Sequence, residues 1–165
     1  ALDVGAEEAM CTHVRLGDFH RQMTETDLKQ GVPNASIPIA WYVHIVQQIR
    51  KAAGRELPVY LFSDGTDEEL QELLELPGVT RKSFGTAIAD IMAMTQAKLF
   101  IASGSTFSRW VRYLGRMNTI CYPGQMGQRL LEDNEAAWEI EAEDLPEAIC
   151  SRLKNSNAHQ QAVQM

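Results

Sequence analysis

The sequence predicts an α/β domain in which a mostly parallel sheet is flanked by helices. Short apolar runs rich in β-branched residues alternate with segments of helical periodicity, which is the pattern of consecutive βαβ units. The chain has 165 residues, 45% of them hydrophobic, so it is long and apolar enough to bury one core. Strands are predicted at Met10–Arg15, Pro58–Ser63, Val79–Lys82, Lys98–Ala102 and Met117–Cys121.

Two helices are predicted in the first half of the chain. Ile39–Ala53 places its apolar residues on one face, and Gly54 follows it where a helix would end. Thr66–Glu69 has the pattern of a capping box, so a second helix should begin there and end near Leu76.

The second half carries further helical patterns. Thr86 can cap a helix that runs to about Ala97, and Ser105–Gly115 is predicted as a helix that directly follows a strand. Beyond it the pattern weakens to a possible helix over Gln128–Trp138 and a clearer one over Asp144–Leu153.

The domain organisation is simple. No linker or internal repeat interrupts the chain, so residues 1–154 are predicted to form one domain and the polar residues 155–165 a disordered tail. Because the chain begins with Ala and soon enters a strand, we expect further sequence upstream or a processed start.

Composition argues against several classes of protein. The formal net charge is −7 and no block of Lys and Arg is present, so binding to nucleic acid is not expected. The three cysteines are far apart and fit neither a zinc site nor a disulfide framework, which favours a reducing, cytoplasmic compartment. No apolar run is long enough to predict a membrane span.

Polar residues at the end of the first predicted strand form the first candidate site. Ligands of open parallel sheets bind beyond the carboxyl ends of the strands. Alternation places His13 and Arg15 on one side of the strand, where guanidinium and imidazole can donate to phosphate oxygens, and Gly17 lets the chain turn. An ion pair between Arg15 and Asp18, with His13 half-exposed, is an equally good interpretation of the spacing.

Two further strand ends are rich in polar groups. Asp64 could accept from a ribose hydroxyl or a base amino group, although an ordinary turn aspartate fits the same pattern. Ser103–Ser108 joins a strand to a helix N-terminus, where free N–H groups and hydroxyls suit a phosphate and Gly104 allows close approach. Ser103 or Ser105 should also cap this helix, which is compatible with phosphate binding.

Together these segments resemble three motifs of the α1,2-, α1,6- and protein O-fucosyltransferase families, with closest similarity to the bacterial α1,2 type. The motifs there read His-x-Arg-Arg-Gly-Asp, Phe-Ser-Asp-Asp, and Asp-x-x-x-Met-Ser-x-Cys-Lys followed by a short strand and Ser-Asn-Ser-Ser-Phe-Ser-Trp-Trp. This chain has His13–Asp18, Phe62–Gly65, Asp90–Lys98 and Ser103–Trp110 in the same order and spacing.

The resemblance implies a metal-independent glycosyltransferase of two Rossmann-like halves, with this chain as the C-terminal, Rossmann-like three-layer half. This half would bind GDP-fucose for inverting transfer to a glycan hydroxyl, and the acceptor site would lie in a missing domain or partner chain. No cofactor is expected besides the donor substrate. The implied catalytic residues are Arg15, which contacts the β-phosphate and stabilises the leaving diphosphate, and His13, which assists.

The resemblance also implies which other residues hold the donor. The diphosphate would lie against Gly17, Ser103, Gly104, Ser105, Thr106 and Phe107. The nucleoside would lie toward Asp64 or Asp90. A capping box with Thr86 is an alternative role for Asp90.

Among the positions that depart from the motifs, three shape the alternatives. Leu16 stands in place of the second Arg and is expected to remove a positive charge from the pocket, while Gly65 and Gly104 replace Asp and Asn. No residue is marked as general base, although Asp18 is the nearest in sequence. The alternative function is a non-catalytic module that binds a nucleotide sugar or phosphate.

The tryptophans are expected to be core or interface anchors, namely Trp41, Trp110 and Trp138.

Overall fold

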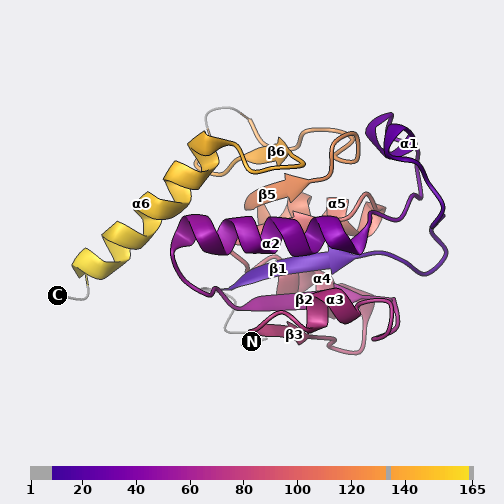
Figure 1. Ribbon diagram of the computed structural model, residues 1–165, viewed down its shortest axis with the longest axis horizontal. Helices are drawn as coiled ribbons and strands as arrows, with labels where there is room; N and C mark the ends of the chain where they lie inside the picture. Colours follow the sequence, from indigo (N-terminus) through magenta and orange to yellow (C-terminus); the bar gives the residue numbers. More distant parts are fainter. Residues whose placement is uncertain (1–8, 133–134, 164–165) are drawn as a thin grey trace.

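Six strands form one parallel sheet in the order β3-β2-β1-β4-β5-β6 (Figure 1). The computed structural model describes residues 9–132 and 135–163, with side chains as far as residue 155. The bounds are β1 Met10–Val14, β2 Val59–Ser63, β3 Val79–Arg81, β4 Leu99–Ala102, β5 Asn118–Cys121 and β6 Glu139–Glu141. The first five strands were predicted and are confirmed to within about two residues at their ends.

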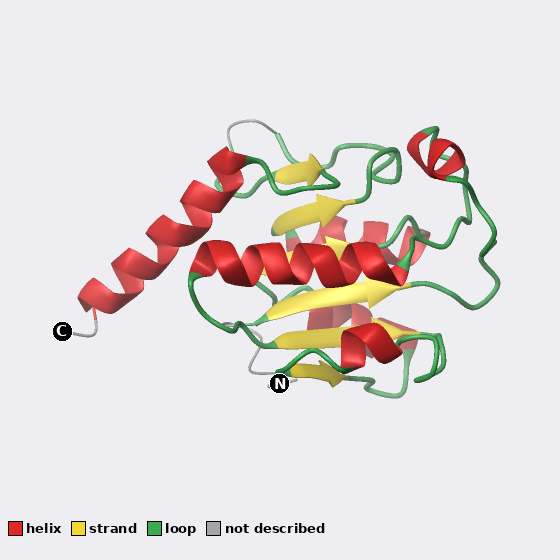
Figure 2. Ribbon diagram, in the orientation of Figure 1, coloured by secondary structure: helices red, strands yellow, loops and turns green. Residues whose placement is uncertain are grey.

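Helices cover both faces of the sheet and make a three-layer α/β domain (Figure 2). One face carries α2 Ile39–Ala53, α3 Gln71–Leu74 and α6 Glu147–Val163. The other carries α4 Ala87–Met94 and α5 Thr106–Gly115. The short α1 Glu25–Lys29, which was not predicted, lies in the long connection between β1 and α2. The predicted Rossmann-like class of fold is confirmed.

The central strands are apolar because both of their faces are buried. Met10 and Val14 of β1 pack under α2, whereas Cys11 between them packs under α4 and α5. Leu61 and Phe62 of β2 divide in the same way. Strands buried on both faces read as continuous apolar runs rather than alternating ones, which is why these segments could be recognised from the sequence.

The strand order has a switch point between β1 and β4. The chain leaves β1 toward β2 and β3 on one side, and leaves β4 toward β5 and β6 on the other. The connections that follow β1 and β4 therefore diverge and leave a crevice at the carboxyl edge of the sheet. The polar strand ends of β1 and β4 meet at this crevice.

The region before β6 differs from its prediction. In the described part of residues 128–138 there is no helix, and the next element is the strand β6. The buried Glu139 of β6 pairs with Arg112 of α5, which lies 27 residues earlier, and accepts hydrogen bonds from the N–H groups of Leu130 and Leu131. A buried carboxylate requires such partners, and they cannot be seen from the local pattern.

Two helix predictions need correction. The capping box of Thr66 and Glu69 forms, but it leads into turns, and α3 covers only Gln71–Leu74. The helix predicted over 144–153 begins at Glu147 and continues as α6 to Val163, where a disordered tail was predicted. No Gly or Pro within α6 stops the helix. That residues 1–154 make up one domain stays a prediction.

Candidate functional site

A cavity of about 240 Å³ opens at the carboxyl edge, beside the switch point. Residues from the ends of β1, β2 and β3 and from the starts of α4 and α5 form its wall. They are His13, Arg15, Phe62, Ser63, Asp64, Ser83, Gly85, Thr86, Ala87, Asp90 and Phe107. Five of the residues predicted for the site thus share one cavity, although 94 positions separate the first from the last (His13 to Phe107, 107 − 13).

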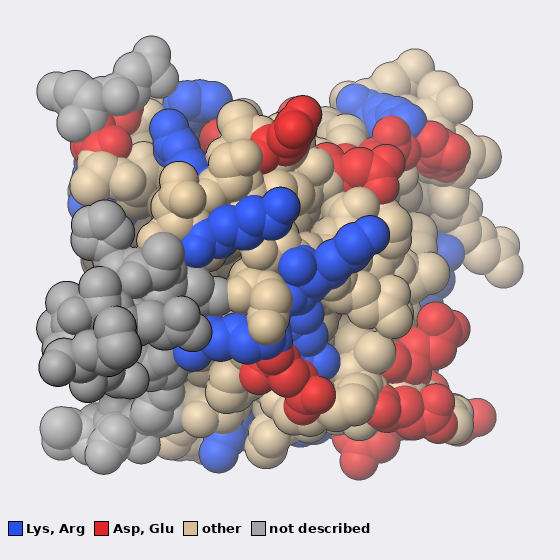
Figure 3. All heavy atoms as spheres, turned by 60° about the vertical axis from the view of Figure 1, so that its left-hand side comes forward, with Lys and Arg blue, Asp and Glu red and all other residues tan. Residues whose placement is uncertain are grey.

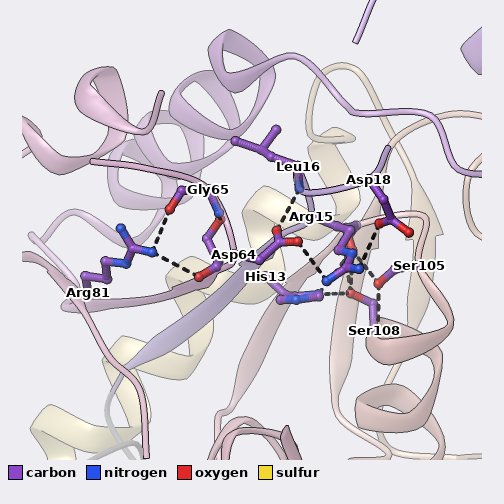
Figure 4. A network of polar contacts seen from close by, with 11 residues as sticks. His13, Arg15, Leu16, Asp18, Asp64, Gly65, Arg81, Ser105 and Ser108 are labelled. Atoms are coloured by element: carbon purple, nitrogen blue, oxygen red, sulfur yellow. Dashed lines mark hydrogen bonds and ion pairs between the residues drawn. The ribbon is translucent and has the colours of Figure 1, made fainter. Parts of the chain in front are cut away.

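Arg15 stands at the centre of an ion-pair network (Figure 4). Its Nη1 lies 2.7 Å from Asp64 Oδ2, and its Nη2 donates to Asp18 Oδ1 at 2.8 Å. The guanidinium also lies over the ring of Phe19, 5.6 Å from its centroid. The ion pair with Asp18, one of the two interpretations of the spacing, is therefore present. Arg15 also lines the cavity.

Asp64 is held ionised by its neighbours. Burial acts to raise its pKa, but hydrogen bonds from the backbone N–H groups of Leu16 and Gly17 and the charge of Arg15 outweigh it, so the pKa is lowered. The bond from Leu16 N to Asp64 Oδ1 measures 2.8 Å. A Cβ at Gly17 would overlap Asp64 Oδ2. Gly17 does not line the cavity, and its place in the site is to let the chain pass close to this carboxylate.

His13 is buried rather than half-exposed, because only 5% of its surface is accessible. Its Nδ1 lies 2.8 Å from Ser108 Oγ and 3.1 Å from Ser103 Oγ, and its ring stacks on Phe107 at a centroid distance of 4.6 Å. Burial, opposed by the charge of Asp64, lowers the pKa of His13 to about 4. The imidazole is therefore neutral at pH 7.

Three buried serines shape the start of α5. Ser105 is the N-cap and accepts from Ser108 N at 3.1 Å, so the predicted capping is confirmed. Ser103 N donates to Ser108 Oγ at 3.1 Å, and Ser103 Oγ lies within 2.9 Å of both other hydroxyls. The N–H groups of Thr106 and Phe107 lie in the first turn, where helix geometry provides no partner within the helix.

Position 104 requires a glycine because a side chain from the connection after β5 lies close to it. A Cβ at Gly104 would overlap Oε1 of the buried Gln125. Gln125 is held there because its Nε2 donates to Leu28 O at 2.7 Å. The replacement of Asn by Gly104 thus leaves room for a contact between two loops at the carboxyl edge.

Leu16 and Gly65, the other two departures from the motifs, are neighbours in space. The Leu16 side chain is only 5% exposed and belongs to the core, and it does not line the cavity. A Cβ at Gly65 would lie 2.5 Å from Leu16 Cδ1. The Leu16 side chain thus packs inward over Gly65, and the expected loss of a positive charge from the pocket stays a prediction.

Asp90 lines the cavity but does not form the capping box considered for it. The side chain of Thr86 accepts from Ala89 N, and Asp90 Oδ1 accepts from Phe84 N at 2.6 Å. Asp90 thereby fixes the loop between β3 and α4. Sequence reasoning missed the other polar residues at this end of the cavity, Ser63, Ser83 and Thr86, although all three follow strand ends.

The remaining predicted residues lie around the cavity rather than in its wall. Ser103, Gly104 and Ser105 form the turn behind Phe107, and Thr106 faces a separate groove along α5. Trp41 is buried and Trp138 packs against the core, whereas Trp110 is exposed and contributes to no core. Of the two predicted roles, a core anchor is therefore confirmed for Trp41 and Trp138, and for Trp110 only the interface role stays a prediction.

Charge is distributed unevenly over the surface. On the side that carries the amino ends of the strands, Lys and Arg gather in the middle of the face, with Asp and Glu toward its margins (Figure 3). The cavity, in contrast, lies at the carboxyl ends of the strands. The positive charge in the cavity wall therefore comes from Arg15 and not from this area.

The described part of the chain offers neither a cluster of metal ligands nor a membrane-spanning helix. No group of three His, Cys, Asp or Glu side chains in this part of the chain could hold a metal ion. None of the described helices is both long and apolar enough to cross a membrane.

The strand order and the polar strand ends at its switch point define a Rossmann-like α/β domain with a ligand cavity at the carboxyl edge. Residues 2–142 match the model of glycosyl transferase family 11. The chain belongs to this family, which comprises fucosyltransferases of the α1,2 type. A comparison with curated proteins found no match to the chain. The resemblance seen in the sequence motifs is thus confirmed at the level of the family.

Proposed function

We propose that the cavity holds the diphosphate of a sugar nucleotide such as GDP-fucose, and that the chain serves fucosyl transfer to a glycan hydroxyl. Membership of glycosyl transferase family 11 supports a sugar-nucleotide donor and a glycan acceptor. The observation that carries the proposal is the convergence of Arg15, His13 and the N-terminus of α5 at the switch point (Figure 4). A guanidinium, a ring N–H and free backbone N–H groups are the donors that phosphate oxygens accept.

Arg15 is the residue proposed to bind the β-phosphate. Its partner Asp18 is 78% exposed, so this carboxylate can return to water when a phosphate takes its place. The second partner, Asp64, is held by Leu16 and keeps the guanidinium aimed at the cavity. In the transfer step, negative charge develops on the leaving diphosphate, and a positioned guanidinium stabilises it.

His13 is proposed to act as a neutral hydrogen-bond donor. Ser108 Oγ accepts from Ser103 N, which leaves its own hydrogen available to His13 Nδ1. In that arrangement the Nε2 of His13 carries the ring hydrogen and can donate to a phosphate oxygen. Burial lowers the pKa of His13 to about 4, which favours the neutral ring at pH 7.

The first turn of α5 completes the proposed diphosphate site. The N–H groups of Thr106 and Phe107 and the helix dipole favour an anion there, and the turn formed by residues 103–105 keeps them in place. The nucleoside is proposed to lie toward the β2 and β3 ends. There Asp90 Oδ2 can accept from a base or ribose, since Phe84 N occupies only Oδ1.

The proposed reaction is inverting and needs no metal. The acceptor hydroxyl attacks C1 of fucose, the bond from C1 to the phosphate oxygen breaks, and the diphosphate leaves with both electrons. The hydroxyl proton passes to a base or to the leaving phosphate. Another domain or a partner chain would complete the acceptor site.

A binding module without catalysis is the second candidate function. Both carboxylates in the described cavity wall already have partners, since Asp64 is bonded to Leu16 and Arg15 and Asp90 to Phe84. A catalytic base needs an available proton acceptor near the acceptor hydroxyl. Hydrolysis or transfer of GDP-fucose by the chain would exclude this candidate.

Thermal unfolding with GDP, GDP-fucose, UDP and ADP tests the donor site. A ligand at 100 times its dissociation constant stabilises by about 2.7 kcal/mol, so the melting temperature should rise with GDP and GDP-fucose. Arg15→Ala should abolish the rise. Arg21→Ala is the matched control, because Arg21 also pairs with a carboxylate, Glu69, but does not line the cavity. A melting temperature that no nucleoside diphosphate changes would refute the proposal.

A further inference from the structure

A second cavity, of about 320 Å³, follows the outer side of α5. Its wall consists of Thr106, Arg109, Trp110, Tyr113 and Leu130. The first four lie at spacings i, i+3, i+4 and i+7, so they form one stripe along the helix. Leu130 closes the groove from the connection between β5 and β6. We call this cavity the α5 groove.

Packing within the domain does not account for the two aromatic side chains of the α5 groove. Trp110 is 52% exposed and Tyr113 is 55% exposed, and neither belongs to a core cluster. Their rings meet edge to face, with centroids 6.0 Å apart and planes at 85°. The two rings are therefore nearly perpendicular, and their surfaces meet a ligand in the groove from two directions.

Polar groups accompany the aromatic rings. Thr106 contributes a hydroxyl, Tyr113 a phenol and Arg109 a guanidinium with several donors. Small-ligand sites combine mostly apolar walls with a few such groups. A sugar ring matches this wall, because its C–H face packs on an aromatic ring while its hydroxyls reach donors and acceptors at the rim. Arg109 stands where the family motif has a Trp, so this chain offers a hydrogen-bond donor there.

The α5 groove begins next to the proposed donor site, because its Thr106 is followed in the chain by Phe107, which lines the donor cavity. Thr106 is the first residue of α5 and belongs to the turn proposed to hold the diphosphate. At about 1.5 Å of rise per residue, Trp110 lies about 6 Å and Tyr113 about 10 Å further along the helix. An oligosaccharide in the groove would thus extend away from the donor phosphates.

We propose that the α5 groove is a subsite for the acceptor glycan, in which Trp110 and Tyr113 pack against sugar rings and Arg109 and Thr106 bind their hydroxyls. This assignment rests on the proposed donor function, because the groove is assigned to the acceptor from its position next to the proposed diphosphate site at Thr106. It makes Arg109 a residue that selects among acceptors.

Titration of the chain with lactose, maltotriose and chitotriose, followed by tryptophan fluorescence and by calorimetry, tests the assignment. We expect at least one of these glycans to bind. Trp110→Ala should weaken its binding about tenfold or more, and Trp110→Phe should retain part of it. Met92→Ala is the matched control, since Met92 is an exposed apolar residue of α4 outside the groove.

Two further measurements separate the outcomes. GDP should shift the melting temperature of Trp110→Ala and of the unmodified chain equally, because Trp110 does not line the donor cavity. A GDP shift without glycan binding would overturn the subsite alone, whereas glycan binding without a GDP shift would overturn the donor proposal alone. If Trp110→Ala lowers the sedimentation mass and leaves glycan binding unchanged, the groove is an interface between copies and the assignment fails.

Discussion

Gly65→Ala should destabilise the protein mainly through its contact with Leu16, the closest of the atoms that the new methyl group would meet. The new Cβ would lie 2.5 Å from Leu16 Cδ1, and Leu16 cannot move into water without losing its burial in the core. Overpacking of this kind costs about 1–3 kcal/mol. Leu16→Ala alone should cost about 2–5 kcal/mol, because it leaves a cavity.

The double variant separates a specific contact from general damage. With Ala at position 16 the overlap with Leu16 Cδ1 disappears, and only the looser approaches to Ser63 Oγ and Glu69 Oε2, both at 3.3 Å, remain. The two costs should therefore not add, and the coupling should reach about 1–2 kcal/mol. Urea unfolding of the four proteins measures it. Val111→Ala is the control, because Val111 packs on the other face of the sheet. Its cost should add to that of Gly65→Ala. Additivity within about 0.5 kcal/mol at positions 16 and 65 would refute the reasoning.

Three further predictions follow from other contacts. Gly17→Ala should displace Asp64 from Arg15 and weaken GDP binding about tenfold by calorimetry, and unchanged affinity would contradict this. Between pH 6.5 and about 4 the unfolded chain protonates at His13, while the folded protein does not. The free energy of unfolding should therefore decrease by up to about 3 kcal/mol as the pH is lowered through this range. Urea unfolding at pH 7.5 and 4.5 should show a smaller loss for His13→Gln, and an equal loss would count against a buried neutral imidazole. Arg112→Met should cost about 3–5 kcal/mol in urea unfolding, since it leaves Glu139 buried without its partner, and a cost below about 1 kcal/mol would contradict the pairing.

The central strands could be predicted because local composition reports their burial. β1, β2 and β4 are buried on both faces, so their apolar runs stand out in the sequence. β6 could not be predicted, since the burial of Glu139 depends on the guanidinium of Arg112 on another element and on the N–H groups of Leu130 and Leu131. A partner that is distant in sequence leaves no local pattern.

The same distinction applies to the site. His13, Arg15, Asp64, Asp90 and Phe107 were predicted and line one cavity, because parallel strands bring their carboxyl ends to one edge. Except for the pair of Arg15 with Asp18, their hydrogen-bond partners could not be predicted.

The three departures from the motifs show what only the fold can explain. Leu16 and Gly65 contact each other across two strand ends, and Gly104 makes room for Gln125. Each is a packing relation between residues at least 21 positions apart (125 − 104). From the sequence, the same changes could be interpreted only as losses of charge or polarity.

A crystal structure with GDP bound tests the central claim most directly. The diphosphate should lie at the switch point, within hydrogen-bond distance of the Arg15 guanidinium and the first N–H groups of α5, with Asp18 released from Arg15. A nucleotide bound elsewhere, with Arg15 still paired to both Asp18 and Asp64, would contradict the account.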